Sequence, residues 1–255
     1  MSIIAILALA GVVLLAALVV WLASPVGISR DAGREGFQDE PASRAYDRTS
    51  SWPIFAFERY LTMRTLKRKM PKGIVLDIGC GPGYLAAKMA RELQETEIVG
   101  LDINPYMVSL AKGNITRLSA DYALVFGDVS ALPFASGSAN AVVTSLSLHH
   151  WIDPTAAFTE IYRVLAPGGR LVVFDPRRNA PRIVFLAFQI GQSLFSPPAI
   201  RRTNGAVGSL WASYTRSELL ALLLAQPFEK ATVTAGPGWL IADCVKARES
   251  SPEKS

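Results

Sequence analysis

The sequence predicts an α/β fold, in which strands and helices alternate along the chain. An apolar run at residues 74–78 breaks into a glycine-rich loop at 79–83, and a helix-period pattern begins at Leu85. A second apolar run ends in an acid, Asp102, about 20 residues past that loop. Further strand-type runs continue as far as residue 245, and helix patterns separate most of them.

Length and composition indicate a single folded domain with appendages. The chain has 255 residues, of which 50% are hydrophobic, so it can bury one sizeable core. Its net charge of +5 would suit nucleic acid, but charged residues make up only 18% and the basic excess lies near apolar segments. An anionic membrane surface explains that excess as well, so no nucleic-acid partner is expected. Cys80 and Cys244 lie far apart, and neither a disulfide framework nor a metal site is expected.

The first segment of the chain is apolar. Residues 3–23 carry no charge, and as a helix they would measure roughly 30 Å, the thickness of a bilayer's hydrocarbon core. The sequence therefore predicts a transmembrane anchor at 1–24, with Trp21 at the interface. A cleaved signal peptide is the alternative, but no basic residue precedes the run and no Ala-x-Ala pattern ends it.

Charge sets the expected orientation of that anchor. Basic residues follow the apolar run and none precedes it, which predicts a single-pass membrane protein with the bulk of the chain in the cytoplasm. Residues 25–44 mix glycine, proline and charges without periodicity, and are expected to form a flexible linker. Residues 45–246 are expected to form the folded domain, and the charged segment 247–255 a disordered tail.

The elements of the domain follow from local patterns. Strand-type runs lie at 74–78, 97–102, 123–126, 141–146, 170–175, 230–234 and 239–245. One helix pattern ends near residues 67–69, and a second follows the glycine loop. Three more lie at 105–118, 153–165 and 215–225. Asp153 and Pro154 supply a cap and a first helical position, and Thr215 with Glu218 forms a capping box.

The glycine loop distinguishes between cofactors. A dinucleotide-binding loop would have its third glycine where Tyr84 stands, so a nicotinamide-dependent oxidoreductase is a less favoured alternative. The spacing Asp-x-Gly-x-Gly-x-Gly, which begins at Asp77, instead resembles the first motif of class I S-adenosylmethionine (SAM) dependent methyltransferases. Across residues 45–246 the chain is similar to small-molecule methyltransferases of type 11, such as those of ubiquinone and menaquinone biosynthesis. This resemblance implies a Rossmann-like, seven-stranded, mostly parallel sheet flanked by helices.

Spacing and resemblance together indicate candidate SAM ligands. Asp102 lies at the distance from the loop that suits an acceptor for both ribose hydroxyls. In the family an acid after the third strand accepts the adenine amino group and the next residue lies against the ring, which points to Asp128 and Val129. Tyr46 is a candidate lid residue, or else it packs the first helix on the sheet. The other expected contacts to SAM are Asp77, Gly79, Gly81, Gly83, Ile103 and Ser145.

Two histidines stand side by side after the fourth predicted strand, at the edge of the sheet where open α/β folds bind ligands. Histidine moves protons near neutral pH, so His149 and His150 are candidate catalytic residues. His149 is the better placed of the two, because it immediately follows the turn at the strand end. The alternative is a structural role in packing or capping.

These features predict a membrane-anchored methyltransferase that moves a methyl group from SAM to a small hydrophobic acceptor, such as a lipid, a quinone or a thiol. A SAM-binding protein without methyl transfer is the alternative, because the same loop and acid bind SAM in either case. Residues 176–214, where arginines surround an apolar stretch, are expected to cover the substrate or the core. The same segment is a second candidate for a membrane contact.

Overall fold

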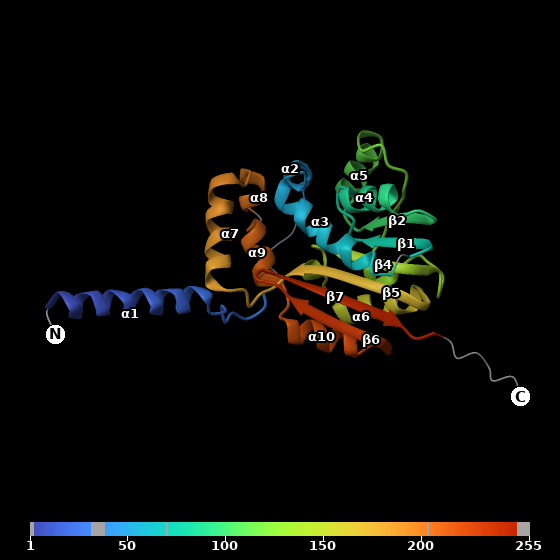
Figure 1. The fold of residues 1–255 in the computed structure, drawn as a ribbon. Coiled ribbons are helices and arrows are strands. Elements are labelled where there is room, and N and C mark those ends of the chain that lie inside the picture. The colour runs from blue at the N-terminus through green and yellow to red at the C-terminus, as the bar shows by residue number, and fades with distance from the viewer. Residues whose placement is uncertain (1–2, 32–38, 70, 203, 249–255) are drawn as a thin grey trace, which may run out of the picture.

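Seven strands form one sheet in the order β3-β2-β1-β4-β5-β7-β6. The computed structural model describes residues 3–31, 39–69, 71–202 and 204–248 (Figure 1). The strands are β1 (Gly73–Ile78), β2 (Thr96–Asp102), β3 (Ala123–Phe126), β4 (Ala139–Ser145), β5 (Leu165–Pro176), β6 (Phe228–Ala235) and β7 (Trp239–Lys246). The first five pair in parallel, whereas β7 runs antiparallel to β5 and β6. The predicted seven-stranded, mostly parallel, Rossmann-like sheet is therefore confirmed.

Helices cover both faces of this sheet. Before the sheet come α1 (Ile3–Ala23), α2 (Glu40–Ser50) and α3 (Pro53–Leu66), and between the strands lie α4 (Tyr84–Glu92), α5 (Pro105–Arg117), η2 (Val129–Ala131), η3 (Leu148–His150), α6 (Pro154–Val164), α7 (Arg182–Phe195), α8 (Pro198–Arg202), α9 (Gly205–Ala212) and α10 (Arg216–Leu224). Helices α3, α4 and α5 pack on one face, and α6 and α10 pack on the other.

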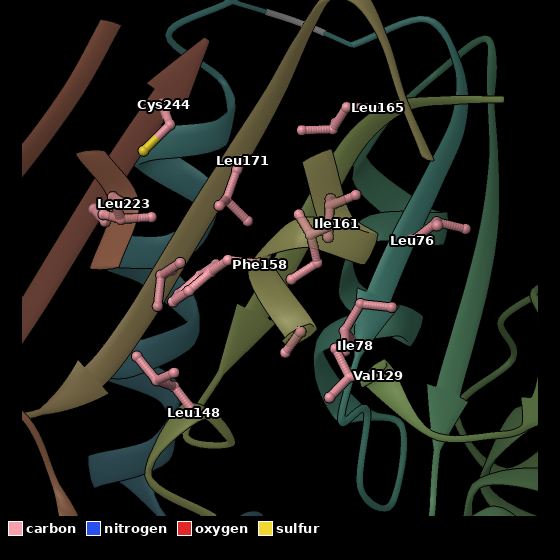
Figure 2. Close-up of a cluster of buried hydrophobic side chains, with 14 of the residues drawn as sticks. Leu76, Ile78, Val129, Leu148, Phe158, Ile161, Leu165, Leu171, Leu223 and Cys244 are labelled. Atoms are coloured by element: carbon pink, nitrogen blue, oxygen red, sulfur yellow. The ribbon is translucent and has the colours of Figure 1, made fainter. Parts of the chain in front are cut away.

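The core consists of two layers, one on each face of the sheet. Successive side chains of a strand point to opposite faces, so Val75 belongs to one layer and Leu76 to the other. The layer under α6 and α10 contains Phe158, Ile161 and Leu171, which Figure 2 shows gathered between helix and sheet. Burial on both faces explains why the central strands are continuous apolar runs rather than alternating ones.

Local capping signals also appear where the sequence predicts them. The Asp153 side chain accepts a hydrogen bond from the Ala156 N–H at 3.0 Å and begins α6. Thr215 and Glu218 form the predicted capping box at the start of α10. These bonds satisfy N–H groups that the first turn of a helix leaves without partners.

Strand β5 begins earlier than the sequence predicts. Leu165 pairs with Ala139 and Arg170 pairs with Ala141, so the register shifts between these two pairs. Residues 166–169, which separate the predicted helix at 153–165 from the predicted strand at 170–175, thus form a bulge within β5 rather than its boundary. Gly168 has a φ of 72°, a conformation that glycine adopts easily, and this allows the strand to bulge and then resume its pairing with β4.

The N-terminal helix differs from the expected membrane anchor. Figure 1 shows α1 extending away from the sheet. Among the residues that the structure describes, no helix is both long and apolar enough to cross a membrane. The predicted transmembrane anchor at 1–24 and the single-pass, cytoplasm-facing topology are therefore contradicted.

The segment 176–214 forms the helices α7, α8 and α9, which pack together with residues 24–31 in a small cluster of their own. Arg178 joins these parts, because its Nε donates to the Ile28 carbonyl at 2.9 Å and its Nη1 donates to the Ser213 carbonyl at 2.9 Å. We call α7–α9 the helical cap. The membrane contact expected for this segment stays a prediction.

The boundaries at the two ends of the domain differ in detail from the predicted ones. The predicted linker at 25–44 includes residues 25–31, which bond to the helical cap through Asp31 and Trp211, and the start of α2 at Glu40. Residues 32–38 of that linker and residues 249–255 of the predicted tail lie outside the described residues. The linker and the disordered tail therefore stay predictions.

Candidate active site

One cavity of about 670 Å³ opens at the carboxyl ends of the parallel strands, a volume typical of small-molecule sites. Most of the residues that the sequence predicts for the site line this cavity, namely Tyr46, Asp77, Gly79, Gly81, Asp102, Ile103, Asp128, Val129, Ser145 and His150. Gly83 and His149 do not line it. The individual roles of these residues stay predictions.

The glycine loop forms the floor of the cavity. Gly81 has a φ of 52°, and a Cβ added there would have only Tyr46 Cε1 near it, at 3.8 Å. Gly83 has a φ of 82° and begins α4, and a Cβ added there would lie 2.0 Å from the Tyr122 hydroxyl oxygen. Gly81 therefore keeps the cavity open to a ligand, whereas Gly83 is required by packing beneath the loop.

The end of β2 is fastened to the same loop. One carboxylate oxygen of Asp102 accepts a hydrogen bond from the Gly81 N–H at 2.8 Å, and the other accepts one from the Asn104 N–H at 2.8 Å. Burial raises the pKa of Asp102, although these backbone N–H groups act in the opposite direction. Each carboxylate oxygen can accept a second hydrogen bond, so the two oxygens of Asp102 can still accept hydrogen bonds from two ribose hydroxyls.

The end of β3 completes this side of the cavity. Asp128 accepts a hydrogen bond from the Ser130 N–H at 2.8 Å, which shapes the short turn η2. Val129 is buried within that turn. Ile103, which follows β2 and also lines the cavity, is 60% exposed. An exposed isoleucine and a buried valine that line one cavity offer apolar surface to a flat ring.

One acid of the cavity, close to the end of β1, is almost fully buried. Asp77 is 1% exposed, and its Oδ2 atom has no hydrogen-bond partner among the described residues. Burial raises the pKa of Asp77 to about 8, and the nearby charges of Glu58 and Asp102 add to the effect. A buried acceptor without a partner suits a cationic or hydrogen-bond-donating group of a ligand.

Glu58 is a cavity residue that the sequence analysis missed. It lies on α3 in a stretch whose apolar spacing indicates an ordinary packing helix, and no local signal distinguishes it. Its carboxylate accepts a hydrogen bond from the Ser145 hydroxyl at the end of β4 and another from Thr62 at 3.5 Å. Burial raises the pKa of Glu58 to about 7, despite the charge of neighbouring Arg59.

Arg59 brings a positive charge to the same part of the cavity. It lines the wall beside Glu58, its Nη1 donates to the Ser50 carbonyl at 3.0 Å, and its guanidinium lies 5.4 Å from the centre of the Tyr84 ring. Burial lowers the pKa of this guanidinium. A planar cation held in this way can pair with a carboxylate of a ligand.

The two histidines occupy different environments. His149 is 2% exposed and its Nδ1 lies 2.8 Å from a carboxylate oxygen of Asp175. His150 lines the cavity, and its ring centre lies 4.1 Å from that of His149. The sequence favours His149 for contact with a ligand, but the structure brings His150 to the cavity instead.

The helical cap does not line the cavity in the described part of the chain. Helices α2 and α3 supply part of the cavity wall instead, through Tyr46, Ser50, Phe55, Glu58 and Arg59. The tyrosine and Phe55 meet edge to face, with ring centres 5.8 Å apart. The cover over the cavity therefore comes from the segment before the sheet rather than from 176–214.

Comparison with known proteins identifies the family. A family model described as a methyltransferase domain matches residues 76–173. A demethylmenaquinone methyltransferase of Deinococcus radiodurans is 34% identical over 165 residues, which cover 65% of this chain and 67% of that protein. The chain belongs to the SAM-dependent methyltransferases. SAM is accordingly the cofactor of this methyltransferase.

Other relatives of this methyltransferase agree on the family and on the fold. A demethylmenaquinone methyltransferase of Thermus thermophilus is 35% identical over 123 residues, or 47% of this chain, and the match spans 56% of that relative's length. A solved structure of a putative SAM-dependent methyltransferase from Methanococcus maripaludis has a TM-score of 0.64 at 20% identity, and the match covers 89% of this chain and 100% of that one. At that identity the likeness shows the fold alone.

The cavity of the methyltransferase fits SAM on three independent observations. The space beside Gly81 admits a ligand, the Asp102 oxygens retain acceptor capacity, and Asp77 Oδ2 is a buried acceptor without a partner. Asp102 would hold the ribose, and Asp77 and Arg59 would hold the charged groups of the amino-acid part.

Proposed function

We propose that this methyltransferase transfers a methyl group from SAM to a small, apolar acceptor, such as a quinone, a lipid or a thiol. The observation that carries the proposal is the continuity of the cavity: the predicted SAM residues at β2 and β3 share one space with an apolar wall at the end of β4. Relatives named demethylmenaquinone methyltransferases favour a quinone ring among these acceptors.

The order of the strands sets the direction in which the ligand lies. β3, β2, β1 and β4 are successive neighbours in the sheet. The residues predicted for adenine and ribose follow β3 and β2, so the amino-acid part of SAM would cross β1 toward β4. The acceptor then belongs at the end of β4, where Leu146 and Trp151 supply apolar wall and Ile152 is fully exposed at the rim.

SAM supplies a methyl group that is already activated by its positively charged sulfur. The chain's own residues therefore need to align the acceptor and exclude water rather than activate the donor. Tyr46 and Phe55 cover the cavity from α2 and α3, and this cover limits access of water to its acceptor end.

The test is methyl transfer by the purified protein. We expect label from methyl-labelled SAM to appear in the reduced, quinol form of demethylmenaquinone with a short side chain, with S-adenosylhomocysteine formed in equal amount. A small thiol and phosphoethanolamine, offered in parallel, show whether an acceptor of another class is preferred. Binding of SAM without S-adenosylhomocysteine from any acceptor would favour a SAM-binding protein that does not transfer methyl groups, and would refute the proposal.

A further inference from the structure

Glu58 is a buried carboxyl group that has only hydroxyl partners. It is 7% exposed and it receives hydrogen bonds from Ser145 and Thr62. Among the described residues, no arginine, lysine or histidine forms an ion pair with it. Burying a carboxyl group in this way costs stability, and a group retained at such a cost in a ligand cavity is a candidate for chemistry.

The position of Glu58 is where the acceptor would lie. Ser145 is the last residue of β4, and the end of β4 is the proposed place of the acceptor. The carboxyl group of Glu58, which belongs to α3, accepts a hydrogen bond from the Ser145 hydroxyl. It is therefore within the acceptor end of the cavity rather than at the adenosine end.

We infer that Glu58 accepts the proton of the methyl acceptor, which must then be a hydroxyl or an acidic carbon of a quinol-like ring. This inference rests on the proposed function. In the step, the X–H bond of the acceptor breaks and its proton joins a Glu58 oxygen. The electron pair left on the acceptor forms the bond to the methyl carbon, and the electrons of the carbon–sulfur bond stay on sulfur. One negative carboxylate and one positive sulfonium are consumed together, so the charges balance.

Other titratable groups line the same cavity as Glu58. The titratable side chains that share this space with Glu58 are Tyr46 from α2, Arg59 from α3, Asp77 from β1, Cys80 from the glycine loop, Tyr84 from α4, Asp102 from β2, Tyr106 from α5, Asp128 after β3 and His150 from η3. Burial sets the pKa of Glu58 at about 7, so the free enzyme has both forms of the carboxyl group near neutral pH.

The decisive variant is Glu58→Gln, because the amide keeps an oxygen that can accept the Ser145 hydrogen bond and removes only the ability to take a proton. With a quinol acceptor we expect kcat to fall about 100-fold or more, while the Kd of SAM changes less than threefold. The kcat/KM of the wild type should rise with pH and level off above about pH 7, and this rise should be absent in the variant. Glu97→Gln, at an exposed position of β2, is the matched control and should behave as the wild type.

A thiol acceptor gives an internal comparison. A thiol ionises near neutral pH without help, so the loss caused by Glu58→Gln should shrink to less than about fivefold with a thiol. A readout that needs no turnover is proton release on binding, measured by calorimetry in buffers of different ionisation enthalpy. At pH 7, SAM should release more protons from the wild type than from Glu58→Gln, and S-adenosylhomocysteine, which lacks the positive sulfur, should show no such difference.

The outcomes separate the two proposals. A wild type that transfers no methyl group to any acceptor would end the proposed function and this inference with it. An active wild type together with a Glu58→Gln variant of unchanged rate and pH profile would overturn this inference alone, and Glu58 would then serve only to join α3 to β4. An equal loss with thiol and quinol acceptors would also overturn it, because the loss would then not depend on the acceptor's proton.

Discussion

At the scale of single residues, acidic side chains gather where β1, β2 and α3 meet the cavity. Glu58, Asp77 and Asp102 are each less than 9% exposed, and burial raises the pKa of all three. Folding therefore favours their protonated forms, and each group costs stability once it ionises. Such a cost is typical of residues retained for binding or catalysis.

Replacing Glu58 by glutamine should make the protein more stable above neutral pH. The pKa of Glu58 rises from 4.5 to about 7 on folding, so its favourable contribution is present below pH 4.5 and is lost as the pH rises through about 7. At pH 8 the variant should exceed the wild type by up to about 3 kcal/mol in free energy of unfolding, and at pH 4.5 the two should agree within about 0.5 kcal/mol. Urea unfolding at both pH values measures this, and a constant difference would contradict it.

Substitution of Gly81 by valine should abolish SAM binding. The positive φ of 52° strains any other residue, and the branched side chain would fill space that the ligand needs. Gly113→Val on α5 is the matched control, because a Cβ there has no atom within 4 Å. We expect calorimetry to detect SAM binding by the control and none by Gly81→Val, with circular dichroism showing both folded. Wild-type affinity of the Gly81 variant would place SAM elsewhere.

Exchanging each histidine for alanine should produce different effects. His149→Ala leaves Asp175 buried without this partner and should lower the free energy of unfolding by about 1–3 kcal/mol. His150→Ala should change stability by less than about 1 kcal/mol but raise the KM of the acceptor, since His150 lines the cavity. Thermal unfolding and steady-state kinetics of the two variants, measured together, test the assignment. Were His149→Ala stable and slow, the proton-handling role predicted from the sequence would belong to His149.

At the scale of secondary-structure elements, the segments before the sheet serve two separate regions. Helices α2 and α3 supply one wall of the cavity, whereas residues 24–31 pack on the helical cap. Val26 and Ile28 pack against the cluster of Ala180, Phe185 and Leu210. A short extended segment thereby stabilises helices that follow it by some 150 positions in the sequence.

Two truncations should separate these roles. Removal of residues 1–23 should leave SAM affinity unchanged, because none of the cavity's lining residues lies there. It should lower the unfolding temperature only slightly, because the contact of Trp21 with Arg182 that it removes is solvent-exposed. Removal of residues 1–31 should also spare SAM affinity but should cost about 1–3 kcal/mol of stability, since Arg178 loses the Ile28 carbonyl and two apolar side chains lose their burial. Differential scanning fluorimetry with and without SAM compares them. Equal unfolding temperatures for both truncations would show that residues 24–31 do not support the cap.

At the scale of the whole molecule, the cavity joins elements that lie far apart in the sequence. Its walls come from α2 and α3, from the ends of β1, β2 and β4, and from the turns η2 and η3. A ligand held by all of them stabilises the folded state as a whole, because the unfolded chain cannot bind it.

SAM at 100 times its Kd should therefore raise the free energy of unfolding by about 2.7 kcal/mol. Asp102→Ala removes a charge-assisted acceptor and should weaken binding by about 1.5–3 kcal/mol, so at the same SAM concentration the stabilisation should fall to half or less. Comparing each variant with and without SAM cancels the loss of the Asp102 bonds to the loop. Asp121→Ala, at an exposed site before β3, is the control. Full stabilisation of Asp102→Ala would show that the ribose is held by other groups.

The sequence alone determined those features that depend on neighbouring residues. Apolar runs, glycine spacing and caps such as Asp153 act over a few positions, so the order of the seven strands, the glycine loop and the helices between β1 and β5 was predicted correctly. The helices α7–α9 were not predicted. The pattern at the N-terminus is equally local, but apolar composition does not establish a membrane span, and the predicted anchor was wrong.

The tertiary structure decided the features that depend on distant partners. Glu58 looks like one polar residue of an amphipathic helix, and only the packing of α3 over β4 buries it against Ser145. The choice between His149 and His150 likewise depends on Asp175, a residue of β5 that lies against only one of them. The burial and the pKa of a side chain depend on which elements pack against it. Strand order and helix packing determine those contacts, and spacing along the chain does not.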